Sequence, residues 1–300
     1  MPGTPVILVT GKNGQVGHAL LRALGQVGTV VAVDRAACDL SDPASIEKAV
    51  QAASPDIIVN AGAYTAVDKA ETEQGKAYAV NAAAPGILAT LAQRSGAALI
   101  HYSTDYVFDG TSLRPYREDD PTGPLSVYGT SKRDGEVAVR DALPAHVILR
   151  TSWVFGAHGA NFLRTMLRLA REREELAVVA DQVGAPTSAD LIADVTAHIV
   201  RRTVQNRGAV PFGTYHLAAG GVTSWHGYAA HAIRSARALG LPIRVADDAI
   251  RAIPTEAYPT PAKRPKNSRL DTSKLQAEFG MVLPPWQDGV DAVLKEWARS

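Results

Sequence analysis

Disulfide bonds, an excess of charge of one sign and long apolar segments are all missing from this sequence of 300 residues. Its single cysteine, Cys38, has no second cysteine to pair with, which is typical of proteins from a reducing compartment. Lysine plus arginine number 31 against 30 aspartate plus glutamate, so no overall field attracts nucleic acid or an anionic membrane. No apolar run approaches the ~20 residues that span a bilayer, and no signal-peptide pattern is present. We therefore expect a cytoplasmic protein with neither nucleic acid nor membrane as a partner.

Several catalytic signatures are missing as well. The eight histidines include no His-Glu-x-x-His pair and the chain has no cysteine cluster, so no metal site is predicted. The sequence contains neither the Gly-x-Ser-x-Gly turn of many hydrolases nor the Gly-Lys-Ser/Thr ending of a phosphate-binding loop. These three classes of enzyme can be set aside.

The first half of the chain alternates short β-branched runs with amphipathic segments. The predicted strands are residues 6–9, 29–33, 56–60, 97–103 and 146–150. Each run is nearly all apolar, as expected for a parallel sheet covered on both faces. Intervening segments such as 16–24 and 85–95 have helical periodicity. This alternation predicts an α/β fold with a Rossmann-like, doubly wound parallel sheet.

The second half is less regular and is predicted to be mostly helical. Residues 161–175 have amphipathic periodicity, Ser188 is a candidate N-cap of one helix, and Thr223 or Ser224 is a candidate N-cap of another. The segment 253–268 contains four prolines and is therefore predicted to be a surface loop.

A length of 300 residues is enough for two modest domains. We assign residues 1–150 to a dinucleotide-binding domain, to which the chain is predicted to return around residues 186–213. Residues 151–300 are assigned mainly to a smaller substrate-binding domain.

A glycine-rich turn, Gly11-Lys-Asn-Gly-Gln-Val-Gly17, follows the first predicted strand and opens the first predicted helix. Glycine is needed where the backbone closely approaches a pyrophosphate, and the helix N-terminus offers free N–H groups to the phosphates. A lone pattern of this kind indicates an ordinary turn. Together with the strand, the helix and a following acidic residue, it predicts a dinucleotide site.

The acidic residue is Asp34, at the end of the second predicted strand. A carboxylate at this place binds the ribose 2′-OH and repels a 2′-phosphate, whereas the next residue, Arg35, is suited to pair with that phosphate. These signals conflict, so NADH and NADPH are both predicted cofactors. The following Asp39 and Leu40 either lie over the adenine or belong to a helix-capping segment.

Tyr128 and Lys132 are four residues apart, which places a phenol and an ammonium on one face of a helix. Because an adjacent cation favours the phenolate, we expect Lys132 to lower the pKa of Tyr128 from its ordinary ~10. Such a pair can donate a proton to a carbonyl oxygen while hydride reaches the carbon. An exposed helix pair is the alternative, but the position downstream of a dinucleotide turn favours the catalytic interpretation.

Thr104 and Asp105 follow a buried predicted strand, at the edge where open α/β sheets bind their ligands. Thr104 is suited to share a hydrogen bond with the substrate oxygen that Tyr128 protonates, and Asp105 to bind sugar hydroxyls. Turn chemistry is the alternative for this polar cluster, and it accounts for Asp109 and Gly110.

With these constellations in order, the chain resembles the extended short-chain dehydrogenase/reductase superfamily and, within it, the dTDP-4-dehydrorhamnose reductase family. Beyond the glycine turn, the resemblance rests on Thr65-Ala-Val-Asp-Lys-Ala-Glu71, His101-Tyr-Ser-Thr-Asp-Tyr-Val-Phe108, Arg150-Thr-Ser-Trp-Val154, Asp181-Gln-Val-Gly-Ala-Pro-Thr187, Tyr258-Pro-Thr-Pro-Ala262 and Asn267-Ser-Arg-Leu270. It implies reduction of the 4-keto group of a dTDP-sugar, dTDP-6-deoxy-L-lyxo-4-hexulose, to dTDP-L-rhamnose by NADPH or NADH.

The resemblance also implies roles for individual residues. Tyr128 is the implied proton donor, Lys132 its partner on the nicotinamide ribose, and Thr104 the residue that tunes the proton transfer. The implied cofactor contacts are Gly11, Asn13, Gly14, Gln15, Val16, Gly17, Asp34, Asp39, Leu40, Ala63, Tyr64, Thr65, Tyr102, Tyr128 and Lys132. The implied substrate contacts are Thr104, Asp105, Trp153 and Arg264.

One departure from the family pattern concerns metal binding. Some members resemble magnesium-bridged dimers held by glutamates, one of them in the first helix. Here Ala19 stands at that place and Asp190 at another of the acidic positions. A metal-bridged dimer is therefore not expected, and no metal ligand is predicted. A homodimer formed without a metal is compatible with the sequence.

Two alternatives stay open at this point. Nucleotide-sugar dehydratases and epimerases share the layout. Dehydratases have Asp-Glu after the threonine, whereas this chain has Asp105 and Tyr106, which weighs against dehydration. The other alternative is a non-catalytic, NADP-binding regulatory subunit similar to the methionine adenosyltransferase β subunit. The presence of Thr104, Tyr128 and Lys132 together favours an enzyme over a binding module.

Overall fold

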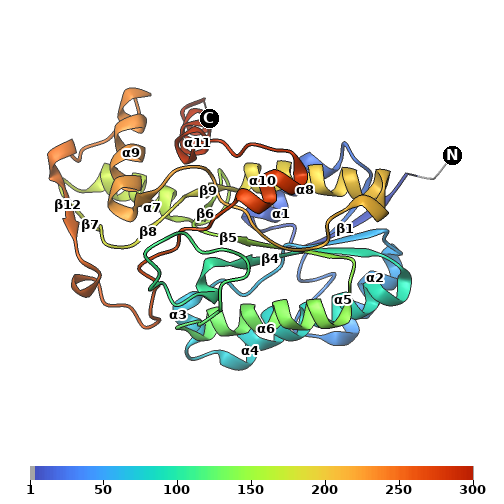
Figure 1. The fold of residues 1–300 in the computed structure, drawn as a ribbon. Coiled ribbons are helices and arrows are strands. Elements are labelled where there is room, and N and C mark those ends of the chain that lie inside the picture. The colour runs from blue at the N-terminus through green and yellow to red at the C-terminus, as the bar shows by residue number, and fades with distance from the viewer. Residues whose placement is uncertain (1–3, 300) are drawn as a thin grey trace.

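One large sheet with helices on both faces dominates the computed structural model, which describes residues 4–299 (Figure 1). Its six strands are parallel and lie in the order β10, β5, β4, β3, β1, β2. Their bounds are β1 Val6–Thr10, β2 Thr29–Val33, β3 Ile57–Asn60, β4 Ala98–Thr104, β5 His146–Thr151 and β10 Gly213–His216. The predicted doubly wound α/β fold is confirmed, and the five predicted strands end within one residue of the predicted positions.

The helices flank the sheet and form most of the second half. They are α1 Gln15–Leu24, α2 Pro43–Ala53, α3 Val67–Ala70, α4 Gln74–Tyr78, α5 Ala84–Ser95, α6 Val127–Ala142, α7 Phe162–Glu172, α8 Ala189–Gln205, α9 Trp225–Ala238, α10 Ser273–Phe279 and α11 Trp286–Arg299. Short helical turns cover Ala79–Ala83, Asp105–Val107, Arg207–Ala209, Asp247–Ala249 and Thr255–Ala257. Within residues 4–299, every helix is too short or too polar to cross a membrane.

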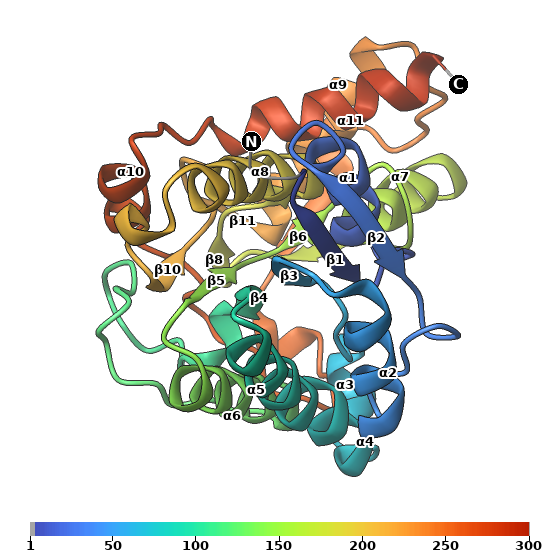
Figure 2. The same cartoon turned by 90° about the vertical axis from the view of Figure 1, so that its right-hand side faces the viewer.

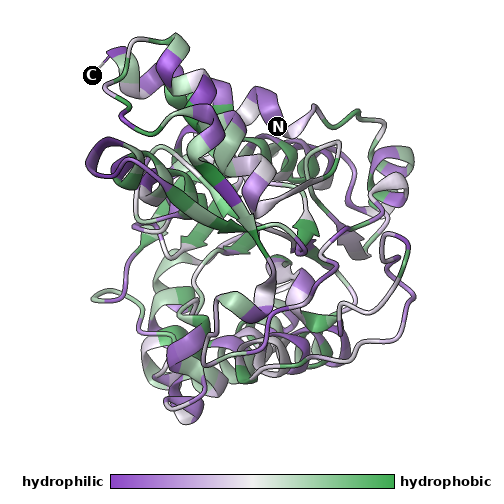
Figure 3. Cartoon of the chain, turned by 90° about the vertical axis from the view of Figure 1, so that its left-hand side faces the viewer, coloured by the Kyte–Doolittle hydropathy of each residue, from purple (hydrophilic) through white to green (hydrophobic). Residues whose placement is uncertain are grey.

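Successive strand residues face opposite helix layers because side chains alternate along a strand. In β1, Ile7 and Val9 pack against α1 and α8, whereas Leu8 between them packs in the layer of α2, α5 and α6. Figure 2 shows these two helix layers above and below the sheet, and Figure 3 shows the apolar character of the strands between them. Burial on both faces explains why the strands are apolar runs.

A second apolar core lies beyond one end of the sheet, around α7, α9 and α11 (Figure 1). Three short strand pairs complete this part: β6 Val154–Phe155 with β9 Thr187–Ser188, β7 Leu176–Val179 with β12 Ile250–Ile253, and β8 Val183–Gly184 with β11 Thr223–Ser224. The helix predicted over 161–175 ends earlier, at Glu172, because Leu176 and Val178 extend into this core as part of β7.

The chain returns to the large sheet after this excursion. The Ser188 hydroxyl accepts a hydrogen bond from the Leu191 N–H and caps α8, which packs on α1. β10 then joins the sheet beside β5. Ser224, and not Thr223, is the N-cap of α9. After β12 the chain crosses back as a proline-containing loop with one helical turn, as predicted for 253–268.

Candidate active site

The glycine turn is shaped by two close backbone approaches. Gly11, with φ of +72°, leaves β1 in a conformation that favours glycine, and a Cβ on it would lie 2.7 Å from the Cα of Gly62. A Cβ on Gly17 would lie 2.1 Å from the carbonyl oxygen of Gly11. The turn therefore brings the N-terminus of α1 against the end of β1, with its N–H groups directed outward as in an anion site.

A cleft of about 260 Å³ opens beside this turn. Eight of the predicted cofactor residues line it: Gly11, Asn13, Gly14, Asp34, Asp39, Leu40, Ala63 and Tyr64. Arg35, Cys38, Ser41, Gly62, Lys76 and Val80 line it as well. Except for Arg35, these residues were not singled out from the sequence. Lys76 and Val80 come from a distant helical segment that carries no motif, so no sequence signal pointed to them.

Charges are already paired at the adenosine end of this cleft. The Lys12 ammonium lies 3.2 Å from Asp34 and holds the pKa of that carboxyl below its usual value, aided by the N–H groups of Ala36 and Ala37. Arg35 turns toward Asp39 at 3.3 Å. Asp34 therefore stays ionised at neutral pH.

Five of the other predicted cofactor residues are not in the lining of the cleft but on α1, after β3 and on β4. Three of them occupy the first turn of α1: Gln15, Val16 and Gly17. Thr65 is exposed beyond β3. Tyr102 turns its hydroxyl to Thr196 of α8 at 2.7 Å, so only its carbonyl oxygen reaches Lys132, at 2.6 Å.

Thr104 and Asp105 stand at the carboxyl end of β4, where β4 passes into a helical turn. The Thr104 hydroxyl donates to Asp105 Oδ1 at 3.1 Å and accepts from the Tyr106 N–H at 3.2 Å. Asp105 is 2% exposed, and burial raises the pKa of its carboxyl to about 6. Its Oδ2 atom is buried and has no hydrogen-bond partner within residues 4–299. Hydrogen bonds from Ser268 and Thr104 to this carboxyl oppose the rise of its pKa.

Helix α6 carries Tyr128 and Lys132 on one face, and Ser126 caps its N-terminus. Burial raises the pKa of Tyr128 to about 12, although a hydrogen bond with the Thr104 hydroxyl opposes this rise. The prediction that Lys132 lowers the pKa of Tyr128 is wrong for the free protein. Lys132 extends instead toward β4, where its Nζ contacts the Tyr102 carbonyl and His101.

Two buried polar groups missed in the sequence surround Lys132. His101 Nε2 lies 3.3 Å from its Nζ. One helical turn along α6, Glu136 forms an ion pair with Arg150 of β5 at 2.7 Å and accepts from the Ser103 hydroxyl. Burial lowers the pKa of Lys132 to about 8, and the charge of Glu136 opposes this shift. For His101 the missed signal was a polar residue inside an otherwise apolar strand. Glu136 lies on α6, and its partner Arg150 comes from another element.

The predicted substrate residues Trp153 and Arg264 lie on two further segments. Trp153 follows β5 with φ of +49°, an uncommon backbone conformation for such a residue, and its ring stacks on Trp225 at 3.7 Å. Arg264 lies in the proline-containing loop and pairs with both oxygens of Asp68, which follows the N-terminus of α3. This ion pair ties the loop to the dinucleotide-binding layer.

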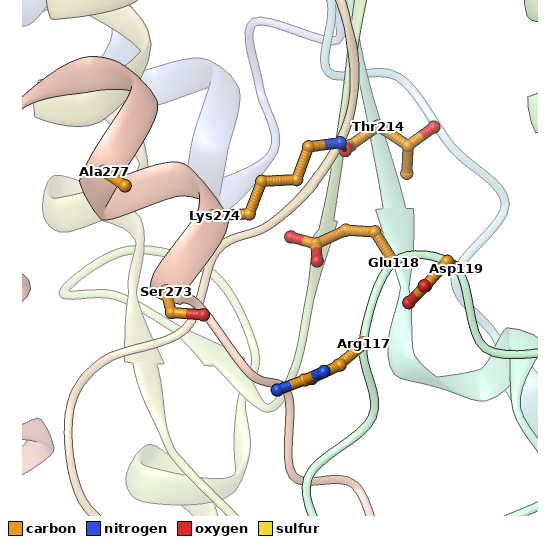
Figure 4. Close-up of a pocket in the computed structure, with 7 residues that line it drawn as sticks. All are labelled: Arg117, Glu118, Asp119, Thr214, Ser273, Lys274 and Ala277. Atoms are coloured by element: carbon orange, nitrogen blue, oxygen red, sulfur yellow. Dashed lines mark hydrogen bonds between the residues drawn. The ribbon is translucent and has the colours of Figure 1, made fainter.

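Another cleft, of about 610 Å³, lies at the β10 edge of the sheet (Figure 4). It contains Arg117, Glu118 and Lys274, but each of these side chains already has a protein partner: Asp271, the His216 N–H and the Thr214 carbonyl. None of the predicted site residues lines it. We therefore place the candidate site at the other cleft.

Between α1 and α8, where the family's metal-bridged dimers were expected to have acidic ligands, an arginine pairs with the acidic residues. Arg22 of α1 lies 3.0 Å from Asp190 and 3.1 Å from Asp194 of α8. In the described range 4–299, histidine, cysteine, aspartate and glutamate side chains form no cluster of three that could hold a metal ion.

Comparisons with known proteins match nearly the whole chain. The model of the RmlD substrate binding domain family matches residues 5–299. A dTDP-4-dehydrorhamnose reductase from Shigella flexneri is 51% identical over 97% of both chains, and one from Escherichia coli K12 is 49% identical over the same share. Among solved structures, dTDP-4-dehydrorhamnose reductase from Bacillus anthracis in complex with NADP has a TM-score of 0.90 at 32% identity, covering 98% of this chain and 100% of that one.

The fold and the relatives define a reductase of the extended short-chain dehydrogenase/reductase class. The sequence identity of about 50% to named reductases narrows this class to one family. The chain belongs to the RmlD family of dTDP-4-dehydrorhamnose reductases.

Proposed function

We propose that this chain is an oxidoreductase that uses NADPH or NADH to reduce the 4-keto group of dTDP-6-deoxy-L-lyxo-4-hexulose, giving dTDP-L-rhamnose. The observation that carries this proposal is the placement of Tyr128 and Lys132 on one helix, with the Thr104 hydroxyl interacting with Tyr128. The relatives support the sugar nucleotide as substrate because they match the chain over nearly its full length.

The cleft has the properties that a dinucleotide requires. Gly11 and Gly17 leave space that any Cβ would fill, and the N–H groups of α1 suit a pyrophosphate. Asn13 and Asp34 would hold the phosphates and the adenosine ribose, and Tyr64 would line the opposite wall. When bound, the cofactor supplies the hydride that reduces the keto carbon.

The chain's own residues would deliver the proton. Because its pKa is about 12, Tyr128 keeps its proton at neutral pH until the keto oxygen gains negative charge. Thr104 orients the phenol through their hydrogen bond. Asp105, next to Thr104, would accept a hydrogen bond from a sugar hydroxyl. Lys132 would bind the nicotinamide ribose and hold positive charge near the phenol after the transfer.

Two further residues are proposed to hold the sugar nucleotide. Trp153 and Trp225 present a stacked aromatic surface that is suited to a sugar or base ring. Arg264 is suited to the diphosphate, and binding there would exchange its pairing with Asp68 for one with phosphate.

The test is consumption of NADPH, then of NADH, with dTDP-6-deoxy-L-lyxo-4-hexulose generated in the assay. Formation of dTDP-L-rhamnose supports the proposal, and the two rates give the cofactor preference. Cofactor binding without turnover would favour the non-catalytic regulatory subunit. Conversion of the sugar without net oxidation of the cofactor would favour an epimerase or a dehydratase.

A further inference from the structure

A row of buried polar side chains leads from the cofactor cleft to Lys132. Thr10, Asn60 and His101 lie on β1, β3 and β4, and each is opposite the next in the register of the sheet. None of the three is more than 1% exposed. They interrupt the apolar layer that faces α6, so their hydrogen bonds must all be made within the protein.

A backbone N–H group, which can only donate, fixes which atom donates and which accepts in each hydrogen bond of this row. The N–H of Gly62, in the wall of the cleft, donates to Thr10 Oγ1 at 3.3 Å, and the Thr10 hydroxyl donates to Asn60 Oδ1 at 2.7 Å. The Asn60 amide nitrogen, a donor, then faces His101 Nδ1 at 3.1 Å. Nδ1 must therefore accept, and the neutral ring carries its hydrogen on Nε2.

This tautomer restricts the protonation state of Lys132. His101 Nε2 lies 3.3 Å from the lysine Nζ. An ammonium group has three hydrogens and no lone pair, so it cannot accept the Nε2–H. A neutral amine can accept it, and the same amine can donate to the Tyr102 carbonyl at 2.6 Å. The row therefore favours the amine.

If donors and acceptors were reversed along the row, the buried Thr10 hydroxyl would be left without an acceptor. If the Asn60 amide turned by 180°, its oxygen would face His101 Nδ1–H, and Nε2 could accept from an ammonium. The amide nitrogen would then face Thr10 Oγ1, which already accepts from the Gly62 N–H. The Thr10 hydroxyl would lose its acceptor, and an unmade bond of this kind is unfavourable in a buried site.

We propose that Thr10, Asn60 and His101 are positioning residues that favour the neutral amine of Lys132 over its ammonium until the cofactor and the sugar bind. The inference rests on the proposed reductase function and adds a set of residues that controls its lysine. When the cofactor and the sugar bind, the amine can take up a proton from solvent, so that an ammonium is present when Tyr128 gives its proton to the keto oxygen. A permanently charged lysine has no such step.

The charged neighbours of Lys132 are compatible with this state. Glu136, one turn along α6, favours the ammonium but is already paired with Arg150 of β5. Tyr128, one turn back, is a neutral phenol at neutral pH. Burial keeps the pKa of His101 well below its ordinary value, so the ring is neutral. Burial and Glu136 together place the pKa of Lys132 at about 8, where the ammonium is still in excess at neutral pH. The hydrogen bond from His101 Nε2–H adds to the share of the amine.

The first experiment reads the tautomer of His101 in the free, full-length protein by ¹⁵N NMR of labelled histidine. We expect the hydrogen on Nε2. In Thr10→Val, which keeps the volume and adds no charge, the Asn60 amide is free to turn. We expect the hydrogen to move to Nδ1 and the pKa of Lys132, followed at its ¹³Cε, to rise by about one pH unit.

Thr203→Val is the matched control, because Thr203 is also buried but its hydroxyl donates to the Ile199 carbonyl within α8. It should change neither readout. A hydrogen on Nδ1 in the unmodified protein would overturn the inference without any variant. An unchanged pKa of Lys132 in a folded Thr10→Val would overturn it as well.

Activity gives a separate readout. If the ammonium is needed in turnover, the alkaline limb of the kcat profile of Thr10→Val should move upward with the pKa of Lys132. A loss of kcat at every pH with an unmoved limb would indicate a merely structural role and count against the inference. The NMR readouts need neither cofactor nor sugar. A protein that has the expected tautomer but reduces no dTDP-sugar would therefore contradict the proposed function alone.

Discussion

Single residues decide the charge that the cofactor cleft presents to an adenosine ribose. Asp34 is ionised, but Lys12 lies 3.2 Å from it, and Arg35 is engaged with Asp39. A carboxylate alone would select NADH. With a lysine beside it, a 2′-phosphate meets a cation as well as an anion, so the residues at this position suit both cofactors.

Replacing Asp34 by alanine should shift the preference toward NADPH. The change removes the repulsion of a 2′-phosphate and frees Lys12 to pair with it. We expect the ratio of kcat/KM for NADPH over that for NADH to rise roughly fivefold at low salt, and less at high salt. Asp34→Asn is the control that keeps the shape and removes only the charge. An unchanged ratio in both variants would mean that other groups set the preference.

Tyr128→Phe tests the proton donor at the same scale. A positioned general acid contributes about 10²- to 10⁴-fold in rate, so we expect kcat to fall by that factor while the Kd for NADPH stays nearly the same. Tyr228→Phe is a matched control, since the Tyr228 hydroxyl is buried without a hydrogen-bond partner within residues 4–299 and its loss should cost nothing. Near-normal turnover of Tyr128→Phe would exclude Tyr128 as the donor.

At the scale of elements, the dinucleotide cleft depends on how tightly β1 and α1 meet. A Cβ on Gly17 would lie 2.1 Å from the Gly11 carbonyl oxygen, so Gly17→Ala must push the helix away from the strand. We expect a loss of about 1–3 kcal/mol in the free energy of unfolding and a large rise in the Kd for NADPH. Denaturant unfolding and a binding titration measure the two effects.

Gly75→Ala is the matched control for that variant. Gly75 lies within α4, and a Cβ on it would meet nothing within 4 Å. This alanine should stabilise the protein by about 0.5–1 kcal/mol, because glycine is unfavourable inside a helix. If Gly17→Ala were tolerated as well as Gly75→Ala, the close packing of β1 and α1 would not be what forms the cleft.

The elements also show how far sequence reasoning reaches. The buried strands were predictable because both faces of each are covered and the pattern is purely apolar. The short strands β7 and β12 were not, since their pairing joins residues about 75 positions apart, as in Leu176 with Ile250, and no local pattern encodes such a contact. For the site, motif spacing placed Tyr128 and Lys132 on one helix. It did not reveal that Lys132 turns toward His101, because that partner comes from another strand.

For the molecule as a whole, the edge strands of the large sheet affect whether two copies of the chain can associate. An exposed edge strand is a template for pairing with another chain. At β10, the two outward backbone groups on either side of Tyr215 are occupied by side chains. Lys274, which extends to Thr214 in Figure 4, donates to the Thr214 carbonyl at 2.8 Å. Glu118 accepts from the His216 N–H at 2.9 Å. These are the groups that a parallel neighbouring strand would use.

The double variant Glu118→Ala/Lys274→Ala should therefore make the sheet edge available for pairing. We expect concentration-dependent association in light scattering, and a loss of about 1–3 kcal/mol in the free energy of unfolding because buried backbone groups near the edge lose their partners. Glu174→Ala/Lys263→Ala makes the same change of charge on exposed positions away from this edge and should leave both measurements unchanged. If the double variant at β10 scatters light like this control at every concentration, the two side chains stabilise the fold locally without protecting the edge. If it associates, the acid and the lysine serve as a substitute for the seventh strand that the sheet lacks at this side.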